Sequence, residues 1–171
     1  MTMRKTLLLI SSILIATACN ENSKKEKSEK ISQRTSTQTI DVKKETQKLF
    51  DSYAPEIEKS NGYVIDNSKL LIGDLNDDGH EDALVFFVLT PVGGGNMIMG
   101  TQMAVYLNRG DKMEVVAGYD PQKIFKPIEI MNNEIHLIEY EYANEDAPNR
   151  PSIENHKCLI LNGNKLMESG L

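Results

Sequence analysis

The sequence predicts an α+β domain in which one N-terminal amphipathic helix precedes a mostly antiparallel β meander. Apolar residues recur at helical spacing over residues 41–59, and short runs rich in Val, Ile, Leu and Phe follow from residue 70 onward. Turn residues separate these runs, as at Asn162-Gly163, where both residues tolerate positive φ. We expect one curved sheet or a small barrel with the helix packed on it, and not a propeller.

Residues 1–18 have the three-part layout of a secretory signal peptide. Arg4 and Lys5 precede an apolar run over residues 7–15, and small residues stand directly before Cys19. The apolar run is shorter than the roughly 20 residues that span a bilayer. A cysteine directly after small residues resembles the lipobox of bacterial lipoproteins. An ordinary cleaved signal peptide followed by a chance cysteine is the alternative.

The lipobox resemblance implies cleavage before Cys19, lipid on that cysteine and a membrane anchor in the cell envelope. If the source has an outer membrane, Asn20 after the anchor favours delivery there. Residues 19–39 then form the lipidated cysteine and a tether rich in Lys, Glu, Ser and Thr, which we expect to be disordered because it has almost no apolar side chains to bury. Residues 40–171 are expected to form a single globular domain.

Charge is distributed unevenly along the chain. Seven of the 19 basic residues but only three of the 25 acidic ones lie before residue 40, so residues 40–171 carry 12 basic and 22 acidic residues. This acidic balance argues against nucleic-acid binding, which depends on cationic contacts to phosphate. It suits cations or a basic partner. The oligomeric state is not indicated.

The predicted helix has recognisable ends. Asp41 is a suitable N-cap residue, and Asn61-Gly62 is a stop signal. The predicted strands follow one another with short connections. They are Leu70–Ile72, Ala83–Leu89, Gln102–Leu107, Met113–Ala117, Ile128–Met131, Ile135–Tyr142, Cys158–Leu161 and Lys165–Glu168.

The segment between the first two predicted strands has the pattern of a calcium loop. Oxygen-bearing side chains stand at loop positions one, three, five and nine, a glycine at position six allows a sharp turn, and the backbone carbonyl of position seven adds an oxygen. Ca²⁺ prefers six to eight oxygen ligands in a flexible shell. The predicted metal ligands are Asp74, Asn76, Asp78, His80 through its backbone, and Asp82, with Ca²⁺ in a structural role.

The loop is not an EF-hand, because position twelve is Val85 inside a predicted strand. The D-x-N-x-D-G-x-x-D pattern resembles instead the calcium loop of FG-GAP and VCBS repeat proteins, the integrin-propeller type. One copy in residues 40–171 cannot build a propeller of at least four blades. The arrangement is also similar to small single-loop secreted bacterial proteins of uncharacterised role. A solvated acidic turn is the alternative interpretation.

Other candidate sites have weaker patterns. The glycines at 93–95 and 100 lack the Lys-Ser/Thr of a phosphate-binding loop, so a connection between strands is expected. Three methionines resemble a sparse copper(I) set but are better explained as core packing. They are Met97, Met99 and Met103.

The remaining titratable side chains favour structural roles. His80, His136 and His156 are far apart in sequence, without His or Cys partners at ligand spacing, and His136 is expected on a sheet face. Cys158 is expected to be a buried thiol. Glu139 and Glu141 share a strand face, where paired carboxylates would permit acid–base work but more often form a solvated surface.

We therefore expect a cell-envelope lipoprotein that is a non-catalytic binding or interaction module with a Ca²⁺-stabilised loop. It would contact the membrane through Cys19 and a protein or envelope partner of unknown identity. One alternative is an envelope hydrolase with an acidic cleft at Glu139 and Glu141 or at the loop carboxylates. Another is an inhibitor that offers its acidic face to a basic partner.

Overall fold

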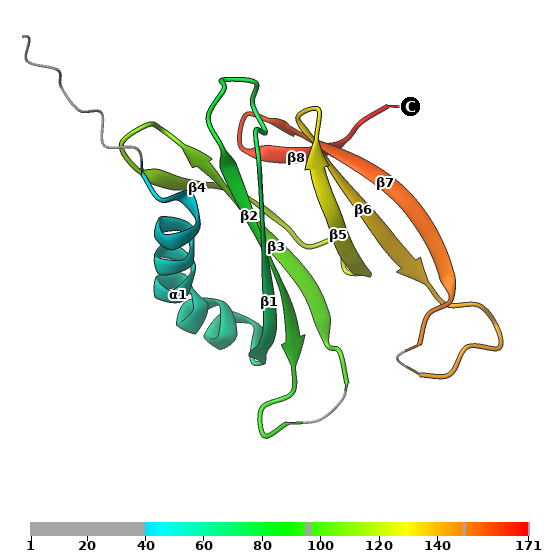
Figure 1. Ribbon diagram of the computed structural model, residues 1–171. Coiled ribbons are helices and arrows are strands. Elements are labelled where there is room, and N and C mark those ends of the chain that lie inside the picture. Colours follow the sequence, from blue (N-terminus) through cyan, green and yellow to red (C-terminus); the bar gives the residue numbers. More distant parts are fainter. Residues whose placement is uncertain (1–39, 95–96, 149, 171) are drawn as a thin grey trace, which may run out of the picture. The chain divides into compact units, whose positions relative to one another are not determined.

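The computed structural model describes residues 40–94, 97–148 and 150–170. The signal peptide, Cys19 and the tether therefore lie outside the described residues. Within the described ranges, one helix is followed by eight strands (Figure 1). They are α1 (Val42–Asn61), β1 (Val64–Gly73), β2 (Asp82–Thr90), β3 (Gly100–Asn108), β4 (Met113–Tyr119), β5 (Ile124–Met131), β6 (Glu134–Glu141), β7 (Ile153–Asn162) and β8 (Lys165–Glu168).

Helix α1 begins and ends at the residues that the sequence predicts. The side chain of Asp41 accepts a hydrogen bond from the backbone N–H of Lys44, as an N-cap residue does. Gly62 ends the helix with a left-handed φ of 71° and donates its N–H to the carbonyl of Glu58. No helix of the described segments has the length and apolar character required to cross a membrane.

The eight strands form two antiparallel four-stranded sheets, ordered β1-β2-β3-β4 and β5-β6-β7-β8. This confirms the α+β class, the N-terminal helix and the antiparallel meander. The meander does not form one curved sheet or a barrel within the described residues, because the chain leaves the first sheet after β4. The linking segment contains Asp120, Pro121 and Gln122, with Gln122 in the left-handed region at a φ of 57°.

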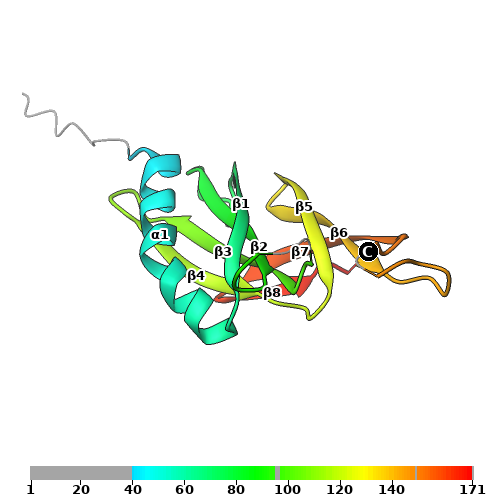
Figure 2. The same cartoon turned by 90° about the horizontal axis from the view of Figure 1, so that it is seen from below.

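The first sheet is covered on both faces (Figure 2). One face packs against α1, with Phe50 of the helix against Phe87 of β2 at a ring-centroid distance of 5.4 Å. The other face packs against the second sheet, with Leu84 and Phe125 in one apolar cluster. Strand β2 is therefore buried on both faces, which explains why its sequence is an almost continuous apolar run rather than an alternating one.

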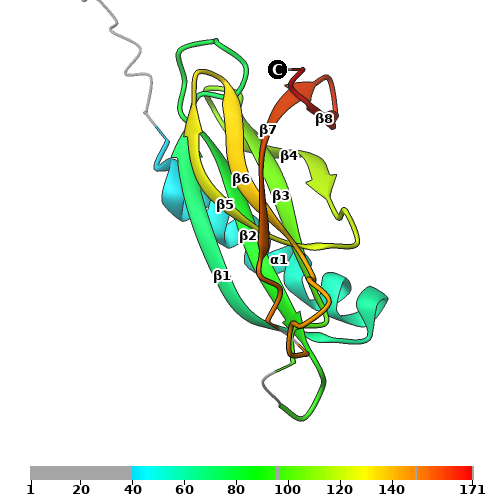
Figure 3. The ribbon, with the colours of Figure 1, turned by 90° about the vertical axis from the view of Figure 1, so that its right-hand side faces the viewer.

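The two sheets are in close contact where β1 ends beside β5. A Cβ atom on Gly73 would lie 2.6 Å from Cγ2 of Ile130, so this contact requires a glycine. The loop that follows Gly73 is the predicted calcium loop. It lies at the same end of the domain as the β5–β6 and β7–β8 turns (Figures 1 and 3).

Candidate functional site

The predicted calcium loop is the tip of the β1–β2 hairpin. Gly73 pairs with Asp82 in the antiparallel ladder, so the loop is closed at its base by the two strands. Two of its residues adopt the left-handed conformation, Asp77 at a φ of 60° and Gly79 at 81°. The glycine thus stands where the chain turns sharply, as its position in the motif predicts.

The carboxylate of Asp74 accepts hydrogen bonds from the backbone of its own loop. Its Oδ1 accepts hydrogen bonds from the N–H groups of Asn76 at 3.1 Å and Asp77 at 2.7 Å, and its Oδ2 accepts one from Gly79 at 2.9 Å. Desolvation raises the pKa of this carboxyl, but the backbone N–H groups together outweigh it, so the pKa lies below its ordinary value. Asp74 is therefore held ionised in a preformed turn.

Asn76 and Asp78 continue the same pattern. The amide of Asn76 donates to Oδ2 of Asp78 at 2.9 Å, and the backbone N–H of His80 donates to Oδ1 of Asp78 at 2.8 Å. The His80 N–H is the largest cause that lowers the pKa of Asp78. The ring nitrogen Nδ1 of His80 also lies 3.1 Å from Oδ1 of Asp78.

Asp82 differs from the other loop carboxylates because it is fully buried. Its Oδ2 accepts the backbone N–H of Leu75 at 2.9 Å, and its Oδ1 accepts that of Asn108 at the end of β3 at 2.8 Å. Burial is the largest cause that raises the pKa of Asp82, and the negative charges of Asp78 and Asp74 raise it further. Asp82 therefore joins the loop to two strands.

The donor set of the loop is made entirely of oxygen atoms, which is the chemistry that Ca²⁺ prefers. The five predicted ligand residues lie together in this single hairpin tip. A carboxylate offers about four lone-pair sites, so the two hydrogen bonds of Asp82 leave acceptor capacity for an ion. The donor chemistry thus suits a hard cation, but within the described residues the carboxylate oxygens of Asp74, Asp78 and Asp82 do not gather within 4.8 Å of one another.

The carboxylates of Glu139 and Glu141 form an ion-paired cluster rather than an open acidic cleft. Nζ of Lys123 lies 2.7 Å from Oε1 of Glu139 and 2.8 Å from Oε1 of Glu141. Nζ of Lys157 lies 3.4 Å from the other oxygen of Glu139. Glu139 is buried, and two lysines compensate its charge. This arrangement favours a structural role over acid–base chemistry.

The glycine-rich segment connects β2 to β3, as expected. The N–H of Met99 donates to the carbonyl of Leu89 at 2.8 Å, which closes the connection; residues 95–96 lie outside the described residues. Met103 is buried in the core between the sheets, whereas Met97 and Met99 are exposed. The three methionines therefore do not converge.

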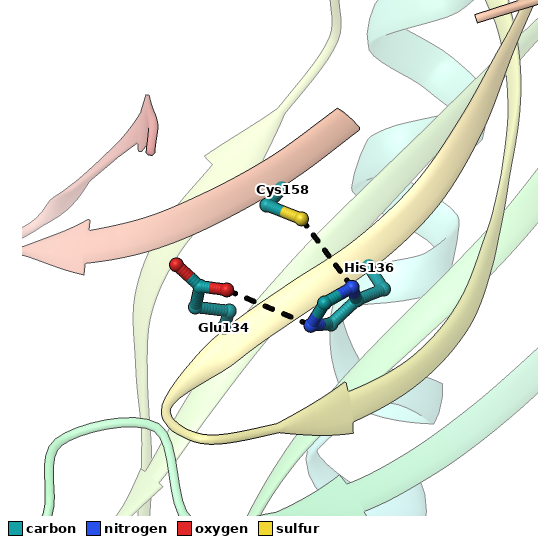
Figure 4. Close-up of side chains that lie close together, drawn as sticks. All are labelled: Glu134, His136 and Cys158. Atoms are coloured by element: carbon teal, nitrogen blue, oxygen red, sulfur yellow. Dashed lines mark hydrogen bonds and ion pairs between the residues drawn. The ribbon is translucent and has the colours of Figure 1, made fainter. Parts of the chain in front are cut away.

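The second sheet contains a cluster that the sequence reasoning missed. Cys158 lies directly opposite His136 in the β6–β7 ladder, and its Sγ is 3.3 Å from Nδ1 of His136. Oε2 of Glu134 is 3.6 Å from Nε2 of the same imidazole (Figure 4). Cys158 is partly exposed, not buried as expected, and His136 does have a cysteine partner. Both strands are identifiable from sequence, but the register that pairs them is not.

This cluster has two chemical interpretations. A thiol beside an imidazole that is itself beside a carboxylate is the order of a nucleophile, base and orienting group. Such a site also needs a cavity for substrate. Two cavities of about 250 and 320 Å³ are lined by other residues, among them Gln102 and Phe86. Metal binding is the interpretation that needs no cavity.

Comparison with known proteins adds no relative. No family model, curated protein or solved structure matches this chain.

Proposed function

We propose that this chain is a lipid-anchored protein of the bacterial cell envelope whose folded domain is a non-catalytic binding module with a Ca²⁺-stabilised loop. The observation that supports the ion is the electrostatics of the β1–β2 loop. Burial raises the pKa of Asp82, and the neighbouring charges of Asp74 and Asp78 raise it further. A cation among these groups would remove the repulsion between them.

The role of the ion is structural in this proposal. Asp74, Asn76 and Asp78 would hold it through their side chains, His80 through its backbone carbonyl and Asp82 from the buried base of the loop. When bound, Ca²⁺ supplies positive charge to the loop. Asp82 also accepts hydrogen bonds from the backbone N–H groups of Leu75 and Asn108. Neutralising the negative charges of Asp74 and Asp78 beside it would therefore stabilise the hairpin and its attachment to β3.

The non-catalytic part of the proposal is supported by the carboxylates outside the loop. A hydrolase that works through a carboxylate pair would need both groups accessible to substrate and at least one with a tuned pKa. Lys123 instead bridges Glu139 and Glu141, and its hydrogen bond lowers the pKa of Glu141. Both carboxylates therefore stabilise the fold through their ion pairs with Lys123.

Calcium titration of the full chain, followed by calorimetry, tests the proposal. The chain carries Cys19→Ser and is kept in mild detergent, and thermal unfolding is followed in Ca²⁺ and in chelator. We expect saturable binding and a higher melting temperature in Ca²⁺. At a free Ca²⁺ concentration ten times the Kd, the free energy of unfolding should rise by about 1.4 kcal/mol.

Two alanine variants identify the site. Asp78→Ala removes a predicted ligand and should abolish binding, whereas Glu81→Ala removes an exposed acidic side chain at a non-ligand position of the same loop and should preserve it. Absence of binding up to millimolar Ca²⁺ would make the loop an acidic turn and end the proposal for this ion. Equal loss in both variants would mean that only overall negative charge matters.

A further inference from the structure

The outer face of the β5–β8 sheet brings together three side chains with different donor atoms. Ile135, Leu137 and Leu159 point into the core between the sheets and are fully buried. Because side chains alternate along a strand, Glu134 and His136 of β6 and Cys158 of β7 point to the opposite face. Figure 4 shows the thiol of Cys158 directed at one ring nitrogen of His136 and the carboxylate of Glu134 directed at the other.

The three side chains are close enough to hold one ion. Their ligand atoms all lie within 4.8 Å of one another. Among the described residues, no other group of three or more His, Cys, Asp or Glu side chains meets this criterion. In a tetrahedral zinc site, bond lengths of about 2.0–2.3 Å place the ligand atoms about 3.5 Å apart. The distance of 3.6 Å from Nε2 to Oε2 matches that spacing. The 3.3 Å contact of Sγ is to the other ring nitrogen, Nδ1, and all three ligand atoms lie within the 4.8 Å limit.

His136 also has a ring nitrogen without a hydrogen bond. Its Nε2 atom is buried and has no hydrogen-bond partner, because Oε2 of Glu134 at 3.6 Å is too distant. An unpaired buried polar atom is costly. A metal ion bound there would satisfy it.

We propose that Glu134, His136 and Cys158 form a binding site for Zn²⁺. One sulfur, one imidazole nitrogen and one carboxylate oxygen suit a borderline-soft ion. Three protein ligands leave a fourth position for water or for a donor from a partner. The site is separate from the β1–β2 loop in residues and in chemistry, since the loop offers oxygen atoms alone and suits a hard cation.

Ser169 holds the proposed site in place from the chain that follows β8. Its Oγ donates to Oε1 of Glu134 at 2.6 Å, and its backbone N–H donates to the carbonyl of Cys158 at 2.8 Å. The hydroxyl occupies one carboxylate oxygen and leaves the other toward His136. Ser169 is therefore a positioning residue, and outer partners of this kind typically contribute about 10–100-fold to metal affinity.

Cobalt spectroscopy on the untagged full chain tests the proposal. Cys19→Ser makes Cys158 the only thiol of the chain, which has two cysteines. Titration with Co²⁺ should produce a thiolate-to-cobalt charge-transfer band at one equivalent, and Zn²⁺ should displace it while excess Ca²⁺ should not. In the unsubstituted site, Zn²⁺ should also slow alkylation of Cys158 by iodoacetamide.

Variants then identify the ligands. Cys158→Ser should remove the band, and His136→Gln and Glu134→Gln should weaken binding about tenfold or more. Ser169→Ala should keep the band but weaken Zn²⁺ binding. The matched control is His156→Gln, which alters an exposed histidine two residues from Cys158 on the same strand and should change nothing. Asp78→Ala should leave Zn²⁺ binding intact, which separates this site from the calcium loop.

Three outcomes would overturn the proposal. The first is the absence of both the band and alkylation protection at millimolar metal. The second is a band that survives Cys158→Ser. The third is a band that depends on Cys158 but not on His136 or Glu134, which would show adventitious binding to a lone thiol. Far-ultraviolet circular dichroism of each variant confirms that it remains folded.

Discussion

Asp82 has two roles, and the sequence motif of the loop indicates only one of them. It occupies the ninth position of the predicted calcium motif, and it is also the residue whose carboxylate accepts two buried backbone N–H groups. One of these comes from Leu75 in the same loop and the other from Asn108 on β3. Asp82 is therefore part of the fold whether or not an ion is bound.

At the residue scale, Asp82→Ala should destabilise the domain even in chelator. The substitution leaves the N–H groups of Leu75 and Asn108 buried without acceptors, and each such group costs about 1–3 kcal/mol. We expect the free energy of unfolding in urea to fall by at least about 2 kcal/mol. Glu81→Ala, one position away and exposed, should change it by less than about 0.5 kcal/mol. Equal stability of the two variants would contradict the structural role of Asp82.

The residue types of the loop could be predicted from sequence, but their bonding could not. The spacing of Asp74, Asn76, Asp78 and Asp82 is visible in the chain and identifies a tight oxygen-rich turn. The bond from Asn108 to Asp82 spans 26 residues and depends on β3 lying beside β2. Local sequence does not contain that contact, so the buried position of Asp82 emerges only in the fold.

At the element scale, the two sheets meet at a glycine. Gly73 ends β1 where Ile130 of β5 packs against it, and its backbone is not in the left-handed region that disfavours other residues. The constraint on position 73 is therefore space between the sheets and not backbone conformation. This contact packs the β1–β2 hairpin against the second sheet.

Gly73→Ala should accordingly destabilise the sheet packing. The added Cβ would lie 2.6 Å from Cγ2 and 2.7 Å from Cβ of Ile130, so β5 must shift. Overpacking of this kind costs about 1–3 kcal/mol, to be measured by urea unfolding. Gly118→Ala is the matched control in β4, because its Cβ would meet only the carbonyl of Met103 at an ordinary 3.9 Å. Similar stability of the two variants would show that the sheets do not meet tightly at Gly73.

The elements themselves were largely predictable, whereas their assembly was not. Turn residues such as Asn162-Gly163 mark strand ends locally, and all eight predicted strands are present. The division into two sheets depends on how the chain leaves β4, and the pairing of His136 with Cys158 depends on the β6–β7 register. Period-two patterns identify strand faces but do not fix which residues stand opposite each other.

At the scale of the whole molecule, the two cysteines have different expected fates. Cys19 follows small residues in the lipobox-like segment, whereas Cys158 lies on β7 beside His136. Cys158 therefore provides a control when lipidation of Cys19 is tested. Stable anchoring requires about two acyl chains, or one chain and a basic segment, because each buried CH₂ contributes only about 0.8 kcal/mol.

Labelling with radioactive palmitate in a bacterial host tests the anchor. The wild-type chain and Cys158→Ser should both incorporate label and be processed to a shorter form that begins at residue 19. Cys19→Ser should lose the label and accumulate as the uncleaved precursor, because the modified thiol is absent. Label that persists in Cys19→Ser would place the lipid on another residue and contradict the anchor at Cys19. Absence of label from the wild-type chain, together with processing of Cys19→Ser at the same site, would replace the lipoprotein with an ordinary secreted protein. The folded domain would then act free of the membrane, and its two proposed ion sites would be unaffected.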